Sequence, residues 1–159
     1  MRDDPKVIVQ EPPFDVSEEY YRLKSASLEV GAISTFVGNV RDLNDGDKVV
    51  GLKLEHYPGM TEKEITKIVG EADERWNIID ATVIHRVGYM SPGDEIVFTG
   101  VSSQHRGDAF QACQFIMDYL KTKATIWKKE TILDGDRWLK TRQSDIDVAN
   151  LWQANELED

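Results

Sequence analysis

The sequence predicts one α+β domain in which antiparallel hairpins pack against helices. The chain has 159 residues, which is the size of one domain, and its 40% apolar content is enough to form a buried core. Strand patterns occur in pairs, and helical patterns lie between the pairs and not after each strand, which disfavours a doubly wound parallel sheet. We expect residues 1–159 to form this domain, with a frayed polar tail from about 153 to 159.

The first elements are a short strand and a helix. Residues 7–9 are apolar and rich in β-branched side chains, which predicts a strand. Asp15 and Glu18 have the spacing of a capping box, so a helix is expected to run from there to about Leu23.

A pair of strands follows. Residues 30–40 are mostly apolar and lead into a polar turn at 41–47, which predicts the end of a strand. Apolar residues then alternate with charged ones over 49–56. We expect these two strands to form a hairpin.

The middle of the chain predicts a helix and a second hairpin. Thr61 and Glu64 have capping-box spacing, and apolar residues then recur at helical intervals. Alternating residues predict strands at 81–87 and 95–101, joined by the turn at 91–94.

The last part is expected to be mainly helical. Residues 108–123 carry so broad an apolar arc that the helix should be buried against more than one surface. A turn at 134–136, a short strand around Trp138 and a helix at about 144–152 complete the prediction.

The overall charge excludes some classes of partner. Asp and Glu outnumber Lys and Arg by 29 to 19, so the surface should repel nucleic acids and anionic membranes. The charged N-terminus has no apolar run of signal-peptide or membrane-span length, which favours a cytoplasmic location. Any anionic ligand therefore needs a local group of basic side chains.

The cysteine and histidine residues form no recognisable metal-binding motif in the sequence. Cys113 is the only cysteine, so an internal disulfide and a cysteine metal cluster are excluded, and its place on an apolar helix face predicts an inert buried thiol. The three histidines have no recognisable metal-ligand spacing.

Two groups of basic residues are candidates for a binding or catalytic site. His105 and Arg106 precede a predicted helix N-terminus, where free N–H groups favour anions, although an ordinary solvated loop fits the same residues. Lys121 and Lys128 adjoin large apolar residues, and partial burial would lower their pKa values. Lysines near a helix C-terminus also simply complement the helix dipole. For Arg41, ligand binding and pairing with a nearby aspartate both remain open.

Several long motifs occur in order along the chain. They are LEHYPGMTEKE (54–64), VIHRVG (83–88), PGDEIVF (92–98), SSQHR (102–106), FIMDYLKTKATIWKKE (115–130) and GDRW (135–138). Together they resemble one family, the large subunit of molybdopterin synthase, and the resemblance extends from about Val7 to Trp152.

This resemblance implies a fold, partners and a reaction. The fold would be of the α/β hammerhead type, and a homodimer would form the centre of a heterotetramer. A small ubiquitin-like sulfur-carrier subunit would insert its C-terminal Gly-Gly thiocarboxylate into the large subunit. Sulfur would pass to cyclic pyranopterin monophosphate and form the dithiolene of molybdopterin, with no metal or other cofactor.

The resemblance also implies residue roles. Lys121 and Lys128 would be catalytic. The residues expected to bind substrate are Arg41, His105, Arg106, Glu130, Lys129, Val40 and Asn39. Asn39 departs from the family pattern, which has lysine there, and Lys129 stands where arginine is common. Glu130 is expected either to orient Lys128 or to form a surface ion pair.

Two other functions fit the residues alone. A lysine-dependent enzyme would form a Schiff base between Lys121 and a carbonyl substrate. A noncatalytic adaptor would bind an anion or a partner without any reaction.

Overall fold

The computed structural model describes residues 1 and 3–155. Its elements, in chain order, are β1 (Lys6–Gln10), α1 (Val16–Ser25), β2 (Ala32–Asn39), β3 (Leu43–Asn44), β4 (Asp47–His56), α2 (Met60–Arg75), β5 (Ile78–Arg86), β6 (Gly88–Met90), β7 (Glu95–Ser103), α3 (Arg106–Lys123), β8 (Ile126–Ile132), β9 (Gly135–Leu139) and α4 (Gln143–Ala154). None of the helices in this part of the chain has the length and apolar content needed to span a bilayer.

The strands form two sheets. The first has the order β1-β5-β7-β2, in which only the pairing of β1 with β5 is parallel. The second has the order β3-β4-β8-β9, with β6 paired to β4, and all of its pairings are antiparallel. The predicted α+β class is therefore confirmed.

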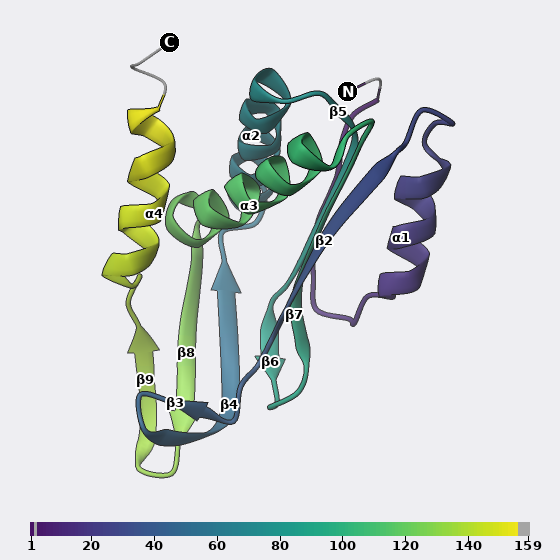
Figure 1. Cartoon of the computed structure of the whole chain (residues 1–159). Helices are drawn as coiled ribbons and strands as arrows, with labels where there is room; N and C mark the ends of the chain where they lie inside the picture. Colours follow the sequence, from purple (N-terminus) through teal and green to yellow (C-terminus); the bar gives the residue numbers. More distant parts are fainter. Residues whose placement is uncertain (2, 156–159) are drawn as a thin grey trace.

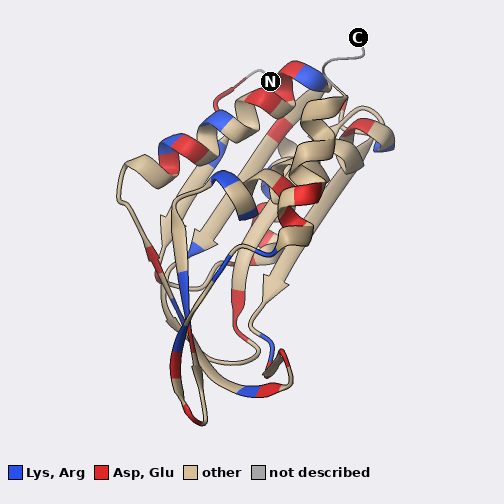
Figure 2. Cartoon of the chain, turned by 90° about the vertical axis from the view of Figure 1, so that its left-hand side faces the viewer, with Lys and Arg blue, Asp and Glu red and all other residues tan. Residues whose placement is uncertain are grey.

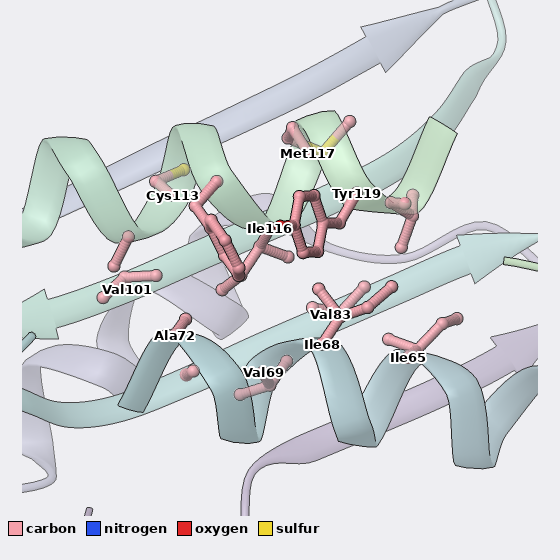
Figure 3. Close-up of a cluster of buried hydrophobic side chains, with 14 of the residues drawn as sticks. Ile65, Ile68, Val69, Ala72, Val83, Val101, Cys113, Ile116, Met117 and Tyr119 are labelled. Atoms are coloured by element: carbon pink, nitrogen blue, oxygen red, sulfur yellow. The ribbon is translucent and has the colours of Figure 1, made fainter. Parts of the chain in front are cut away.

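Helices cover both faces of the first sheet (Figure 1). α1 packs on one face, where Leu23 meets Ile84 and Phe98 in a small buried cluster. α2 and α3 pack on the other face, and Figure 3 shows their apolar side chains pointing toward one another above strands of that sheet. This arrangement buries α3 against several elements, as its broad apolar arc predicts.

The hairpin predicted from 30–40 and 49–56 is wrong. β2 pairs with β7 in the first sheet, whereas β4 lies in the second sheet between β6 and β8. A register shift at Gly38/Asn39 precedes the last pair of β2, Asn39 with Glu95, and the polar turn then makes its own small hairpin between β3 and β4. Asp45 and Gly46 have positive φ values of 50° and 81°, which this tight turn requires.

The helices are confirmed with shifted ends. α2 begins at Met60, and the Glu62 carboxylate accepts the Gly59 N–H, so the predicted capping box at Thr61 and Glu64 is wrong. Glu64 instead accepts hydrogen bonds from Thr125.

The C-terminal part differs in two details. β8 was not expected, because the charged run Lys128–Glu130 interrupts its apolar pattern. α4 continues through Ala154, and the part of the predicted tail at 156–159 lies outside the described residues.

Candidate active site

β8 places its candidate residues on opposite faces of the second sheet. Side chains alternate along a strand, so Lys128 and Glu130 share one face and Lys129 lies on the other. Lys129 forms an ion pair with Asp136 at 3.5 Å and lies over the Trp138 ring at 5.7 Å from its centroid. The structure therefore brings Lys128 and Glu130 to the same side and separates Lys129 from them.

Lys128 is partly buried and electrostatically coupled to Lys121. Burial lowers the pKa of Lys128 below its ordinary value, the positive charge of Lys121 lowers it further, and Asp145 on α4 opposes both effects. Partial burial is thus confirmed for Lys128 and wrong for Lys121, which is exposed in the last turn of α3. Lys128 thus has a partly buried amine, and the exposed ammonium of Lys121 helps to lower its pKa.

A neutral histidine lies close to this lysine pair. His85 on β5 is 4% exposed, and burial, with a smaller contribution from the charge of Lys128, lowers its pKa to about 4. Its Nδ1 lies 2.8 Å from the Arg86 carbonyl, which can only accept, so Nδ1 carries the proton. At neutral pH His85 adds no positive charge beside the lysines.

Glu130 belongs to a buried ion pair. Its Oε1 accepts from Arg137 Nε at 2.9 Å and from Nη2 at 2.6 Å, and its Oε2 accepts from Asn44 Nδ2 at 2.9 Å. The carboxylate is 3% exposed, so it is not a surface pair, and both oxygens are engaged by groups other than Lys128. The expectation that Glu130 orients Lys128 is therefore wrong.

Arg41 lies next to this network through Asn44. Its Nη2 donates to Asn44 Oδ1 at 3.3 Å, and Arg142 Nη2 donates to the same oxygen at 2.7 Å. Neither Asp42 nor Asp45 forms an ion pair with Arg41 in the described part of the chain, whereas Asp45 lies 3.7 Å from Arg142. Arg41 and Arg142 thus both contact the Glu130 network through Asn44.

An open cleft of about 610 Å³ adjoins Arg41. The residues that line it are Val40, Arg41, Asp42, Leu43, Pro92 and Gly93. The side chain of Val40 is 5% exposed, and its backbone hydrogen-bonds with Gly93 and Asp94. Asn39 is exposed at the end of β2. Substrate contact by Val40 and Asn39 stays a prediction.

His105 and Arg106 lie at the opposite end of α3 from Lys121. His105 is the N-cap residue, and the helix runs unbroken from Arg106 to Lys123 (Figure 1). At 1.5 Å per residue, the 16 positions from His105 to Lys121 correspond to about 24 Å. Within one chain, the structure does not bring these two candidate groups together.

Basic residues alternate with acidic ones along the chain. Figure 2 shows Lys and Arg interspersed with Asp and Glu along the ribbon, and the net charge of the sequence is −10. In the described residues, no cluster of three or more His, Cys, Asp and Glu side chains could hold a metal ion. Anion binding therefore depends on the arginines and lysines described above.

Cys113 is buried on α3 and chemically protected. Burial raises its pKa to about 11 from an ordinary 9.0, so the reactive thiolate is scarce at neutral pH. Its Sγ donates a long hydrogen bond of 3.8 Å to the Thr99 carbonyl.

For the sulfur transfer that the sequence resemblance implies, Cys113→Ala is expected to retain activity while losing about 1 kcal/mol of stability through poorer packing. Turnover and thermal unfolding of the same preparation measure the two effects. A fully folded but inactive variant would show that this thiol takes part in the reaction.

Comparison with known proteins identifies the family. A family model described as "MoaE protein" matches residues 9–123, which is more than half of the chain. The chain belongs to the MoaE protein family. Relatives named "Molybdopterin synthase catalytic subunit" from Vibrio cholerae and Escherichia coli are 54% and 55% identical to it. These alignments cover 94% and 92% of this chain, and 99% and 97% of the relatives.

A solved structure of the same family supports the fold. The MoaE protein of Burkholderia ambifaria has a TM-score of 0.81 and 45% identity, and the alignment covers 94% of this chain and 98% of that one. The candidate lysines of β8 lie beyond the residues matched by the family model but within the range that a 94% alignment spans.

For this member of the MoaE family, sequence reasoning missed Asn44, His85 and Arg142. Arg142 directly precedes a predicted helix, yet its partner Asn44 lies 98 positions away in the chain. Asn44 lies within the predicted polar turn at 41–47. No local pattern signals such long-range contacts.

Proposed function

We propose that this chain is the catalytic subunit of a molybdopterin synthase. It transfers sulfur from the C-terminal Gly-Gly thiocarboxylate of a small ubiquitin-like carrier to cyclic pyranopterin monophosphate. Relatives named "Molybdopterin synthase catalytic subunit", at 54% and 55% identity over nearly their whole length, support the activity. Because they are described as a subunit, a second chain is part of the proposal. A cytoplasmic location is part of the same proposal.

The observation that carries the mechanism is the coupled pair Lys121 and Lys128. The exposed ammonium of Lys121 would neutralise the incoming thiocarboxylate and stabilise an oxyanion that develops on it. Lys128, with its lowered pKa, is the better candidate for a neutral amine that accepts a proton. Arg41, beside the open cleft, would bind the phosphate of the precursor.

The source of sulfur follows from Cys113. This one cysteine is buried and its thiol pKa is raised, so the chain lacks an accessible thiolate to relay sulfur. A thiocarboxylate on another protein supplies sulfur without such a relay.

Reconstitution tests the proposed function. The chain is incubated with thiocarboxylated carrier and precursor, and dithiolene formation is measured, with carboxylate-ended carrier as the control. Product that depends on the thiocarboxylate is expected. Borohydride trapping of Lys121 with a carbonyl substrate alone would favour a Schiff-base enzyme, and binding without product would favour an adaptor.

The rate is expected to rise with pH as Lys128 loses its proton. Asp145 raises the pKa of Lys128, so Asp145→Asn should lower that pKa and move the midpoint of the rise to lower pH.

Asp147→Asn is the matched control for this prediction. Asp147 also lies on α4, but its carboxylate accepts a hydrogen bond from Gln143. Its profile should match that of the unmodified chain. An unchanged or upward midpoint for Asp145→Asn would rule out Lys128 as the group that titrates.

We further propose a homodimer in which each site combines Lys121 and Lys128 of one copy with His105 and Arg106 of the other. The distance of about 24 Å along α3 supports this, because one small substrate cannot bridge it within a chain.

A further inference from the structure

Asn44 is the point at which two cationic side chains and one buried anion meet. Its side-chain oxygen accepts from Arg41 at 3.3 Å and from Arg142 at 2.7 Å, while its Nδ2 donates to Glu130 at 2.9 Å. The residue is 7% exposed, so this amide is almost fully enclosed by its partners.

The orientation of the amide follows from the chemistry of these partners. A carboxylate only accepts hydrogen bonds, so Glu130 must face the NH₂ group of Asn44. A guanidinium only donates, so both arginines must face its oxygen. The amide therefore cannot flip without losing all three hydrogen bonds.

The backbone around Asn44 is fixed as well. The residue lies in β3, directly before the tight turn formed by Asp45 and Gly46. Arg137 donates from Nη2 to the Asn44 carbonyl at 3.2 Å and from Nη1 to Asp47 at 2.9 Å. Arg137 also pairs with Glu130, so one guanidinium ties the β3–β4 hairpin to β8.

The arginines themselves remain open to solvent. Arg41 is exposed and has no carboxylate within ion-pair distance among the described residues. The side chain of Arg142 is 54% exposed, and its ion pair with Asp45 at 3.7 Å is also exposed and weak. Each guanidinium has five N–H donors, so most remain available beside a neutral acceptor.

We propose that Asn44 is a positioning residue, which holds Arg41 and Arg142 on one oxygen and so preforms a two-arginine fork for the phosphate of the substrate. This role rests on the proposed function, since a phosphorylated precursor supplies the anion. Asn44 acts through the arginines and does not touch the reacting atoms.

Binding of inorganic phosphate tests this role without any turnover. Titration of the full chain, followed by the arginine side-chain N–H signals, should show Asn44→Ala weakening phosphate binding about tenfold. Thr131→Ala is the matched control, because it removes the 2.7 Å hydrogen bond to Asp136 on the neighbouring β8–β9 hairpin without reaching either arginine. Its phosphate affinity should be unchanged.

A double-mutant cycle separates positioning from a general structural effect. In a chain that already carries Arg41→Ala and Arg142→Ala, adding Asn44→Ala should change phosphate affinity less than about twofold. If Asn44→Ala does not fold, Asn44→Ser, whose hydroxyl can still donate to Glu130, is measured by the same criteria. In turnover, KM for the precursor should rise and kcat should change little.

The outcomes distinguish this proposal from the proposed function. A folded Asn44 variant with unchanged phosphate affinity, or an equal loss in the arginine-free background, would overturn the positioning role. Absence of phosphate binding by the unmodified chain would also overturn it. The expected binding pattern without any dithiolene product would contradict the proposed function and support the fork.

Discussion

Lys121→Ala is expected to lower dithiolene formation by about a thousandfold or more, because it removes the ammonium that we propose stabilises the thiocarboxylate. The side chain is exposed in the last turn of α3, so its removal should leave the fold and carrier binding largely intact. Single-turnover assays, carrier-binding measurements and thermal unfolding check the three expectations.

Lys123→Ala is the matched control for this substitution. Lys123 is exposed in the same helical turn, but its Nζ lies over the Tyr119 ring at 3.9 Å from the centroid. Its removal should leave turnover near normal. Near-normal turnover of Lys121→Ala would instead eliminate the chemical role of Lys121.

Local sequence patterns predicted where helices, strands and turns lie better than they predicted which strands pair. The Asp15 cap is confirmed, since its side chain accepts the Glu18 N–H at 3.1 Å. The turn at 91–94 is confirmed by the hydrogen bond from Ser91 N to Asp94 Oδ2. The pairing of β2 with β7 could not be read locally, because β4 follows β2 sooner in the chain and a strong turn separates them.

The same limit applies to the candidate site. Adjacent apolar residues suggested equal burial for Lys121 and Lys128, but only Lys128 lies in a strand, between β4 and β9, and is partly buried. Glu130 looked like a partner of its near neighbour in sequence, whereas it pairs with Arg137 across the β8–β9 hairpin and with Asn44 from β3. Residue type and local pattern identified chemical candidates, and contacts between distant segments determined their partners.

The structure changes how two copies would have to meet. The apolar face of α3 cannot pack across a dimer, because Cys113, Ile116 and Tyr119 pack inside the chain (Figure 3). Phe110, which is 64% exposed one turn after Arg106, is an apolar group that remains at the surface of this helix. Contact near Phe110 would place Arg106 of one copy close to the other copy.

Mixing two inactive chains is expected to restore activity if each site is shared. An Arg106→Ala chain and a Lys121→Ala chain, mixed equally and allowed to exchange, form mixed dimers in half of the cases. Each mixed dimer has one site with both residues intact, so about a quarter of normal activity should return.

Mixing Lys121→Ala with Lys128→Ala is the control. Because both residues belong to the same copy's part of the site, no mixed dimer regains an intact one. Exchange proven by mass labelling, with no recovery in the first mixture, would mean that each site is built from one chain alone.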